Sequence, residues 1–177
     1  MTLVAWIFVA VAAMIFQSKI SLFGYPLNLS VVIVYAFGIS QSIQQSASRS
    51  VSVSAEIKSV IFGAAVGILE DGMTGTVMGP NLLGKGFAGF VSSFIFRDVF
   101  FQWDSVLGGI VLCLLTVADG FIVIGARLIF SNAAVGGWAV SRLIVLQAIM
   151  NIPLGLLIRP GPKESAERIW FRRRRYN

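Results

Sequence analysis

Long apolar runs separated by short polar stretches dominate the chain. Six such runs occupy most of the first 158 residues, at 2–16 (extending to 23 if Lys19 is included), 27–43, 53–69, 81–96, 106–130 and 135–158. A helix that crosses the hydrocarbon core of a bilayer needs about 20 mostly apolar residues. The pattern therefore predicts an all-α, polytopic membrane domain of six transmembrane helices over residues 1–158. Several runs are short, so we expect some helix ends to lie at the headgroups.

The stretches between the runs predict turns and loops. Residues 24–26 contain a proline, which cannot continue a helix. Residues 40–54 hold seven Ser and three Gln, and we expect the longest loop there. Residues 71–80 are rich in Gly and mix apolar with polar positions, which suits a segment that dips into the bilayer. Shorter turns are expected at 97–105 and 131–132.

The first apolar run resembles a retained helix more than a cleaved signal peptide. No Lys or Arg precedes it, whereas a signal peptide begins with a positively charged region. We therefore count residues 2–16 among the six spans.

Composition supports a membrane protein and excludes several kinds of chemistry. Hydrophobic residues make up 56% of the chain and charged residues 12%, against about 25% charged in soluble domains. The chain has no His, which excludes imidazole metal sites and His-based catalytic triads. Its single cysteine, Cys113, can form neither an internal disulfide nor a thiolate metal cage. We expect no cofactor, no metal and no enzymatic activity.

The positive charge predicts an orientation in the membrane. Seven of the 14 basic residues lie in a tail at 159–177. Six spans place both termini on one side, and that side holds more basic residues (Arg49, Lys58, Arg97 and the tail) than the other (Lys19, Arg127 and Lys85). Because short cytoplasmic loops carry the excess of Lys and Arg, both termini are predicted to be cytoplasmic. The tail is expected to bind anionic lipid, not nucleic acid.

Charged residues inside the apolar runs need an explanation, since each costs roughly 2.5–3.5 kcal/mol on insertion scales. We expect Lys85 and Arg127 to reach the membrane surface through their long side chains. Asp119 is too short for that, so it is either protonated or paired across helices. Lys85 and Arg142 are its candidate partners, and structural pairing is favoured over a proton relay.

Glycines and two polar residues mark the region between the third and fourth runs. Gly63 and Gly67 have the spacing that places two glycines on one helix face, and Gly89 belongs to the next helix. Such bare surfaces serve either internal packing or an intermolecular interface, and the sequence leaves both open. Asp71 and Asn81 are expected to cap free backbone groups at the helix ends.

These residues resemble a known family. A short six-span protein with a Gly-x-x-x-Gly…Asp…Gly…Gly-x-Asn-x-Leu element between spans three and four is similar to the MreD family of rod shape-determining proteins. The matching positions are Gly63, Gly67, Asp71, Gly75, Gly79, Asn81, Leu82 and Gly89. The basic aromatic tail is longer than is usual for the family. The resemblance implies no catalytic residues, and a fold similar to the substrate-binding subunits of energy-coupling-factor vitamin transporters.

The resemblance also implies a function. MreD-like proteins lie in the bacterial inner membrane and work with the bitopic protein MreC. The same machinery includes a RodA-type glycosyltransferase, a class B penicillin-binding transpeptidase and the actin-like MreB. We therefore expect a non-enzymatic scaffold of lateral peptidoglycan synthesis, with Gly63 and Gly67 on the surface that binds MreC. The alternative is a transporter substrate-binding subunit, in which Asp71, Asn81, Lys85, Asp119 and Arg142 would line an outer cavity. A lipid-modifying enzyme is the least favoured hypothesis.

Overall fold

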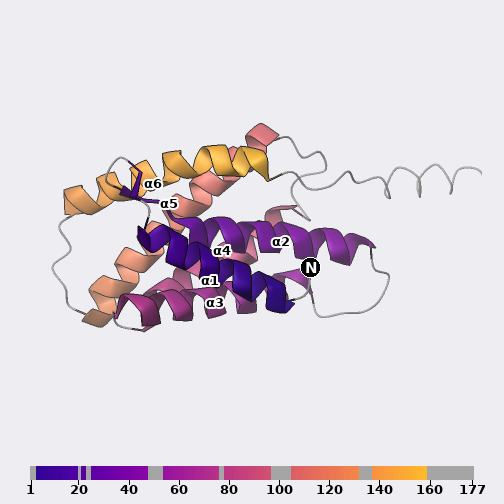
Figure 1. Ribbon diagram of the computed structural model, residues 1–177, viewed down its shortest axis with the longest axis horizontal. Helices are drawn as coiled ribbons and strands as arrows, with labels where there is room; N and C mark the ends of the chain where they lie inside the picture. Colours follow the sequence, from indigo (N-terminus) through magenta and orange to yellow (C-terminus); the bar gives the residue numbers. More distant parts are fainter. Residues whose placement is uncertain are drawn as a thin grey trace, which may run out of the picture.

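The chain folds into a bundle of helices, seen in a computed structural model (Figure 1). The structure describes residues 3–19, 21–22, 25–47, 54–75, 78–96, 105–131 and 137–158. The helices are α1 (Leu3–Lys19), α2 (Leu29–Ala47), α3 (Ala55–Thr74), α4 (Pro80–Phe94), α5 (Ser105–Ser131) and α6 (Gly137–Leu157). Two short strands, β1 (Ser21–Leu22) and β2 (Tyr25–Pro26), pair antiparallel between α1 and α2. The all-α prediction is confirmed, with one helix in each of the six apolar runs.

The helices are arranged around α2 and α4. Helix α4 packs against α2, α3 and α5, while α6 packs mainly on α5 and α1 mainly on α2. In Figure 1 the helices α1, α2 and α3 run along the long axis of the view, and α5 crosses them obliquely. The start of α1, the end of α2, the start of α3 and the end of α6 lie at one end of the bundle, which we call the first end. The α3–α4 junction lies at the opposite end.

The core combines aliphatic side chains with stacked aromatic rings. Val31, Val34 and Leu112 are fully buried. The rings of Phe37 and Phe62 stack with their centroids 4.1 Å apart, and Trp6 meets both rings edge-on. This aromatic cluster joins α1, α2 and α3.

The predicted loop at 40–54 is wrong for its first half, because α2 continues to Ala47. The polar side chains of this part bond to neighbouring helices. Ser42 Oγ donates to the backbone oxygen of Ser93 at 3.0 Å, and Gln45 Oε1 accepts from the backbone N–H of Ala55 at 2.7 Å. A helix face that hydrogen-bonds to neighbouring helices needs polar residues, so its composition is the same as that of a loop. This explains why residues 40–47 were predicted to be a loop. Residues 48–53 lie outside the described part of the chain.

The glycine-rich stretch at 71–80 is also more helical than predicted, since α3 runs to Thr74 and α4 begins at Pro80. Gly75 ends α3 with φ of 62°, the left-handed conformation that glycine adopts without steric cost. Gly79 precedes α4 with φ of 126°. The predicted turns at 97–105 and 131–132, Gly24 and the tail at 159–177 fall wholly or largely outside the described residues.

Helices α3 and α4 approach closely through glycine. A Cβ atom at Gly63 would overlap the backbone carbonyl of Lys85, and one at Gly67 would overlap that of Asn81. From the other side, a Cβ at Gly89 would overlap the carbonyl of Ser59. Of the two possibilities left open by the sequence, these three glycines have the geometry of internal packing. They face α4 or α3 and leave no bare surface for a partner.

Two of the described helices are long and apolar enough to cross a membrane, Ser105–Phe130 and Trp138–Leu157. Leu3–Lys19 is a shorter apolar helix. Helix α3 is long but carries four charged residues, at positions 56, 58, 70 and 71. The remaining described helices, α2 and α4, are too short or too polar to count as helices that could cross a membrane by length and composition.

The close α3–α4 contact gives a first prediction. Replacing Gly67 by Val forces the two backbones apart, and overpacking of this kind costs typically about 1–3 kcal/mol. We expect Gly67→Val to lower the thermal midpoint of the purified protein in detergent. Gly72 is the matched control, because it lies in the same helix and a Cβ atom added there would meet nothing within 4 Å. Gly72→Ala should leave the midpoint unchanged or raise it slightly. An unchanged midpoint for Gly67→Val would contradict the packing.

Candidate functional site

A buried lysine lies where α3, α4 and α5 meet. Lys85 is 1% exposed, and its Nζ lies 3.0 Å from Asp119 Oδ2, 3.2 Å from Glu70 Oε2 and 3.2 Å from Asn81 Oδ1. An ammonium group has three protons to donate, and three oxygens surround this one. We call Glu70, Lys85 and Asp119 the charged cluster. Its two acids and one base come from three helices, so the cluster ties them together.

Asp119 is held from several sides. Its Oδ2 accepts from Lys85 and also from Asn28 Nδ2 at 3.1 Å. A Cβ atom at Gly84 would overlap Asp119 Oδ1, so the glycine makes room for the carboxylate beside α4. Within the described residues, Oδ1 has no hydrogen-bond donor. Glu70 Oε2 likewise has no hydrogen-bond donor among the described residues, although it is ion-paired with Lys85.

Asp71 links the end of α3 to the start of α4. Its Oδ2 accepts from the backbone N–H of Gly79 at 2.9 Å, and its Oδ1 accepts from Asn81 Nδ2 at 2.8 Å. The Asn81 backbone N–H also points to Oδ1, at 3.3 Å. The first N–H groups of a helix have no partner inside the helix, so a carboxylate there satisfies them and complements the helix dipole. The predicted capping role of Asp71 is confirmed, whereas Asn81 connects Asp71 to Lys85.

Further polar residues extend this network toward α1, α2 and α6. Asn28 Oδ1 accepts from the Ser30 hydroxyl, and the Asn28 backbone oxygen accepts from Asn151 Nδ2 at 3.3 Å. Asn151 Nδ2 also donates to Thr116 Oγ1 at 3.0 Å. Gln17 Oε1, from α1, accepts from the backbone N–H of Leu29 at 2.8 Å. Buried polar groups are stabilising only when bonded, and through Asn28 this network connects α1, α2 and α6 to the charged cluster.

A small polar cavity adjoins the charged cluster. Its volume is about 180 Å³, and it opens between α1, α3, α5 and α6. The polar side chains that line it are Gln17, Asn28, Glu70, Asn81, Lys85, Asp119, Arg127 and Gln147. Among the described residues, no group of three or more His, Cys, Asp or Glu side chains is placed to hold a metal ion. The cavity can accept water or a small polar molecule.

The sequence-predicted charges are only partly brought together. Asp119 pairs with Lys85, one of its two candidate partners, and this pairing is confirmed. Arg142 lies exposed on α6 and does not line the cavity. The expectation that Lys85 reaches the membrane surface is wrong, because Asp119 and Glu70 hold it inside. Arg127 is half-buried at the cavity wall.

Three amide residues of the network were not singled out from the sequence. Asn28, Asn151 and Gln17 are amides at the start of α2, inside α6 and near the end of α1. An isolated amide in an apolar run is the signal that could have identified Asn151, since such a group needs a hydrogen-bond partner in an apolar environment.

Comparison with known proteins adds no relative: no family model, curated protein or solved structure matches this chain.

The charged cluster gives a second prediction. Lys85→Met leaves the buried Asp119 and the partly exposed Glu70 without their cation, and breaking one side of a buried ion pair costs about 3–5 kcal/mol. Asp119→Asn should cost less, because Glu70 remains as a counter-ion. The double variant should be less destabilised than the sum of the two single variants, a coupling that thermal or denaturant unfolding in detergent measures.

The matched control is Arg142→Gln, which removes an exposed charge from α6 and should leave stability unchanged. If Lys85→Met unfolds at the same midpoint as the unaltered protein, the ion pairs contribute nothing and the interpretation of the cluster is wrong.

Proposed function

We propose that this chain is a six-span protein of the bacterial inner membrane that serves as a non-enzymatic scaffold in cell elongation, similar to the MreD family. In this role it binds an MreC-like bitopic protein and supports lateral peptidoglycan synthesis. RodA-type glycosyltransferase, class B penicillin-binding transpeptidase and MreB are the wider partners that the proposal implies.

The distribution of apolar surface supports membrane embedding by more than two helices. Large apolar side chains point outward from five helices, for example Phe8, Ile61, Phe90, Leu114 and Leu157. Helix α2 exposes no large apolar side chain among its described residues and lies inside the bundle. Asp71, Lys85 and Asp119 are buried while large apolar side chains are exposed, which suits a lipid environment. Helix α4 has 15 residues, about 22 Å, and would need local thinning of the bilayer.

The arrangement of the ends supports cytoplasmic termini. The start of α1 and the end of α6 share the first end of the bundle, where Lys58 also lies (Figure 1). Lys19 lies at the opposite end. The basic tail continues from α6, so the first end has the greater positive charge and is assigned to the cytoplasm.

One observation carries the link to the MreD family: the positions of the resemblance form a single structural unit. Gly63, Gly67 and Gly89 set the close α3–α4 contact. Asp71 caps α4 through Gly79 and Asn81, while Gly75 ends α3. A motif that builds one helix junction has a physical reason to recur in proteins of one fold.

The partner surface needs to be placed differently from the sequence-based expectation. Gly63 and Gly67 are enclosed by α4, so they cannot contact a partner directly. The outward side of α4 instead presents Leu83, Phe87, Phe90 and Phe94, each 41–46% exposed. The rings of Phe90 and Phe94 stack 5.9 Å apart. This stripe, at helical spacing, is the surface we assign to the single transmembrane helix of the MreC-like partner.

A third prediction tests this surface. Phe87→Ala combined with Phe94→Ala removes two rings that lie about two helical turns apart on the same face of α4. We expect recovery of an MreC-like protein with the tagged chain, after crosslinking in cells and mass spectrometry, to fall at least about tenfold. Leu114→Ala with Phe121→Ala is the matched control, with the same spacing on the exposed side of α5.

Equal recovery with the α4 and α5 variants would remove α4 from the interface. If the unaltered chain recovers no MreC-like protein or wall synthase at all, the scaffold proposal itself fails.

The polar cavity favours a second candidate, the substrate-binding subunit of an energy-coupling-factor vitamin transporter. Asn81, Lys85 and Asp119 line it as that hypothesis requires, but Asp71 is turned toward α4 and Arg142 is exposed. Lys85 is already hydrogen-bonded to Asn81 and Asp119 and ion-paired with Glu70, and the cavity of about 180 Å³ lies below the roughly 300–1,000 Å³ usual for ligand sites. The α1 helix also has no Ala-x-x-x-Ala pair.

A fourth prediction separates the two candidates. We expect thiamine, riboflavin and biotin, each added to the purified protein, to leave its thermal midpoint unchanged. A shift with any of them, lost in Gln147→Ala at the cavity wall and kept in Gln44→Ala outside it, would favour the transporter subunit. Co-purification of an ATP-binding-cassette ATPase would support the same conclusion.

A further inference from the structure

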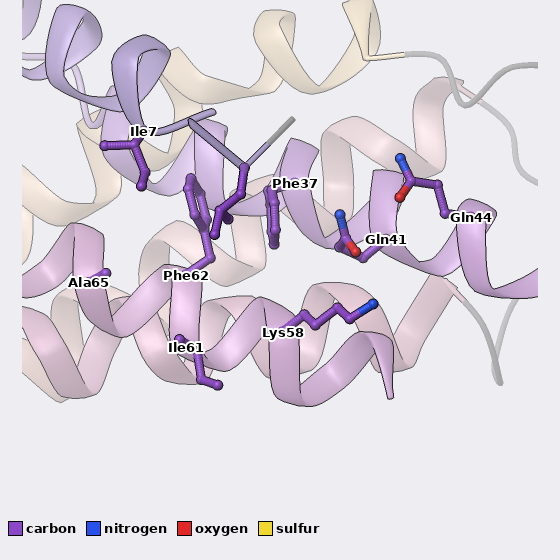
Figure 2. Close-up of a pocket in the computed structure, with 9 residues that line it drawn as sticks. Ile7, Phe37, Gln41, Gln44, Lys58, Ile61, Phe62 and Ala65 are labelled. Atoms are coloured by element: carbon purple, nitrogen blue, oxygen red, sulfur yellow. The ribbon is translucent and has the colours of Figure 1, made fainter. Parts of the chain in front are cut away.

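A groove runs between α1, α2 and α3 near the first end of the bundle. It has a volume of about 470 Å³ and is lined by Leu3, Ile7, Phe37, Gln41, Gln44, Lys58, Ile61, Phe62 and Ala65. The α3 residues lie at positions 58, 61, 62 and 65, which form one helix face about 10 Å long. Figure 2 shows the labelled lining side chains, which come from the three helices, with Phe37 and Phe62 next to each other. The volume falls within the usual range for a small-molecule site.

The groove changes from apolar to polar along its length. The stacked rings of Phe37 and Phe62 form its inner part, together with Ile7 and Ala65. Gln41, Gln44 and Lys58 line the part nearest the end of α2 and the start of α3 (Figure 2). None of the lining residues is acidic. The groove therefore offers an apolar floor and, at one end, a cation with two amide donors.

A second depression between α1 and α3, at the opposite end of their boundary, differs from the groove in the charged residue that lines it. It is about 290 Å³ in volume and is lined by Met14, Gln17, Ser18, Glu70, Met73 and Thr74. It has an acid where the first groove has a lysine. Glu70 is paired with Lys85, and only the first depression has a lysine among its lining residues, so only the first is suited to an anion.

We propose that the groove binds one anionic phospholipid of the cytoplasmic leaflet. The phosphate lies at Lys58, the amides of Gln41 and Gln44 donate to the phosphate or ester oxygens, and an acyl chain packs on Phe37, Phe62 and Ala65. This inference rests on the proposed membrane orientation, which places Lys58 at the cytoplasmic surface where anionic lipids attract basic residues. The proposed contacts include no residue of the basic tail, which follows α6 in the sequence.

Trp6 provides a local probe for this lipid. Its ring lies 5.5 Å from that of Phe37 and 6.3 Å from that of Phe62, so a quencher in the groove would be close to it. The other tryptophans are replaced (Trp103→Phe, Trp138→Phe, Trp170→Phe), and the protein is reconstituted into vesicles containing phosphatidylglycerol or phosphatidylcholine with brominated acyl chains. We expect a roughly fivefold preference for phosphatidylglycerol in the quenching of Trp6, the ratio that one Lys–lipid contact gives.

The variants identify the contacts. Lys58→Ala should reduce the preference to near unity, while Lys19→Ala at the opposite end should keep it. Ala65→Phe fills the apolar part of the groove and should reduce quenching by both lipids. Equal quenching by the two lipids in the unaltered protein, or a preference that survives Lys58→Ala, would overturn the proposal.

Other occupants and the wider proposal are tested separately. With Cys113 replaced by Ser, a cysteine introduced by Ile61→Cys that crosslinks in native membranes to a second copy or to another protein's helix would show that protein fills the groove and overturn the lipid site. A chain that does not enter vesicles at all would overturn the membrane proposal together with the lipid site. A chain that inserts normally but shows no lipid preference would overturn the lipid site alone.

Discussion

The buried ammonium of Lys85 is the interaction on which the rest of the bundle depends. A charge away from water is stable only when oxygens surround it, and here they must come from α3, α4 and α5 at once. That requirement sets the spacing of the three helices. Gly84 leaves space for Asp119, and Asn81 is held by Asp71 so that its side-chain oxygen points at Lys85. The glycine contacts and the helix caps are thus the means by which the charges meet.

Three helices begin in a similar way. A side-chain oxygen from the preceding helix accepts a hydrogen bond from a backbone N–H group at or next to the start of the helix. Gln17 of α1 bonds to the start of α2, Gln45 of α2 to the start of α3, and Asp71 of α3 to the region where α4 begins. In an apolar environment an unpaired N–H group is costly, because no water is available to replace the missing partner. Each helix therefore helps to satisfy the next one along the chain, which favours sequential packing and explains polar residues at helix ends.

Much of the fold could be predicted because it depends on the length of apolar runs. All six helices lie where these runs predict them. The errors arise where composition is ambiguous. Residues 40–47 have the polarity of a loop, but Ser42 and Gln45 bond to neighbouring helices. Whether Lys85 is buried or reaches the surface depends on Glu70 and Asp119, which are distant in sequence. No local sequence pattern indicates that these side chains lie close to Lys85. The same holds for Asn28, whose carboxylate partner Asp119 belongs to another helix.

The interior and the exterior of the bundle therefore serve different purposes. The residues that would look functional in a soluble enzyme, namely buried acids, a lysine and several amides, bond mainly to one another. Outside the bundle, α4 presents aromatic rings, and the α1–α3 boundary carries a lysine near one end and a glutamate near the other. The glutamate, Glu70, is paired with Lys85, so the difference between the two ends of this boundary comes chiefly from the lysine, Lys58. In the proposed scaffold role, an interior of this kind would keep the outer surfaces of the bundle in fixed positions for lipid and for partner helices.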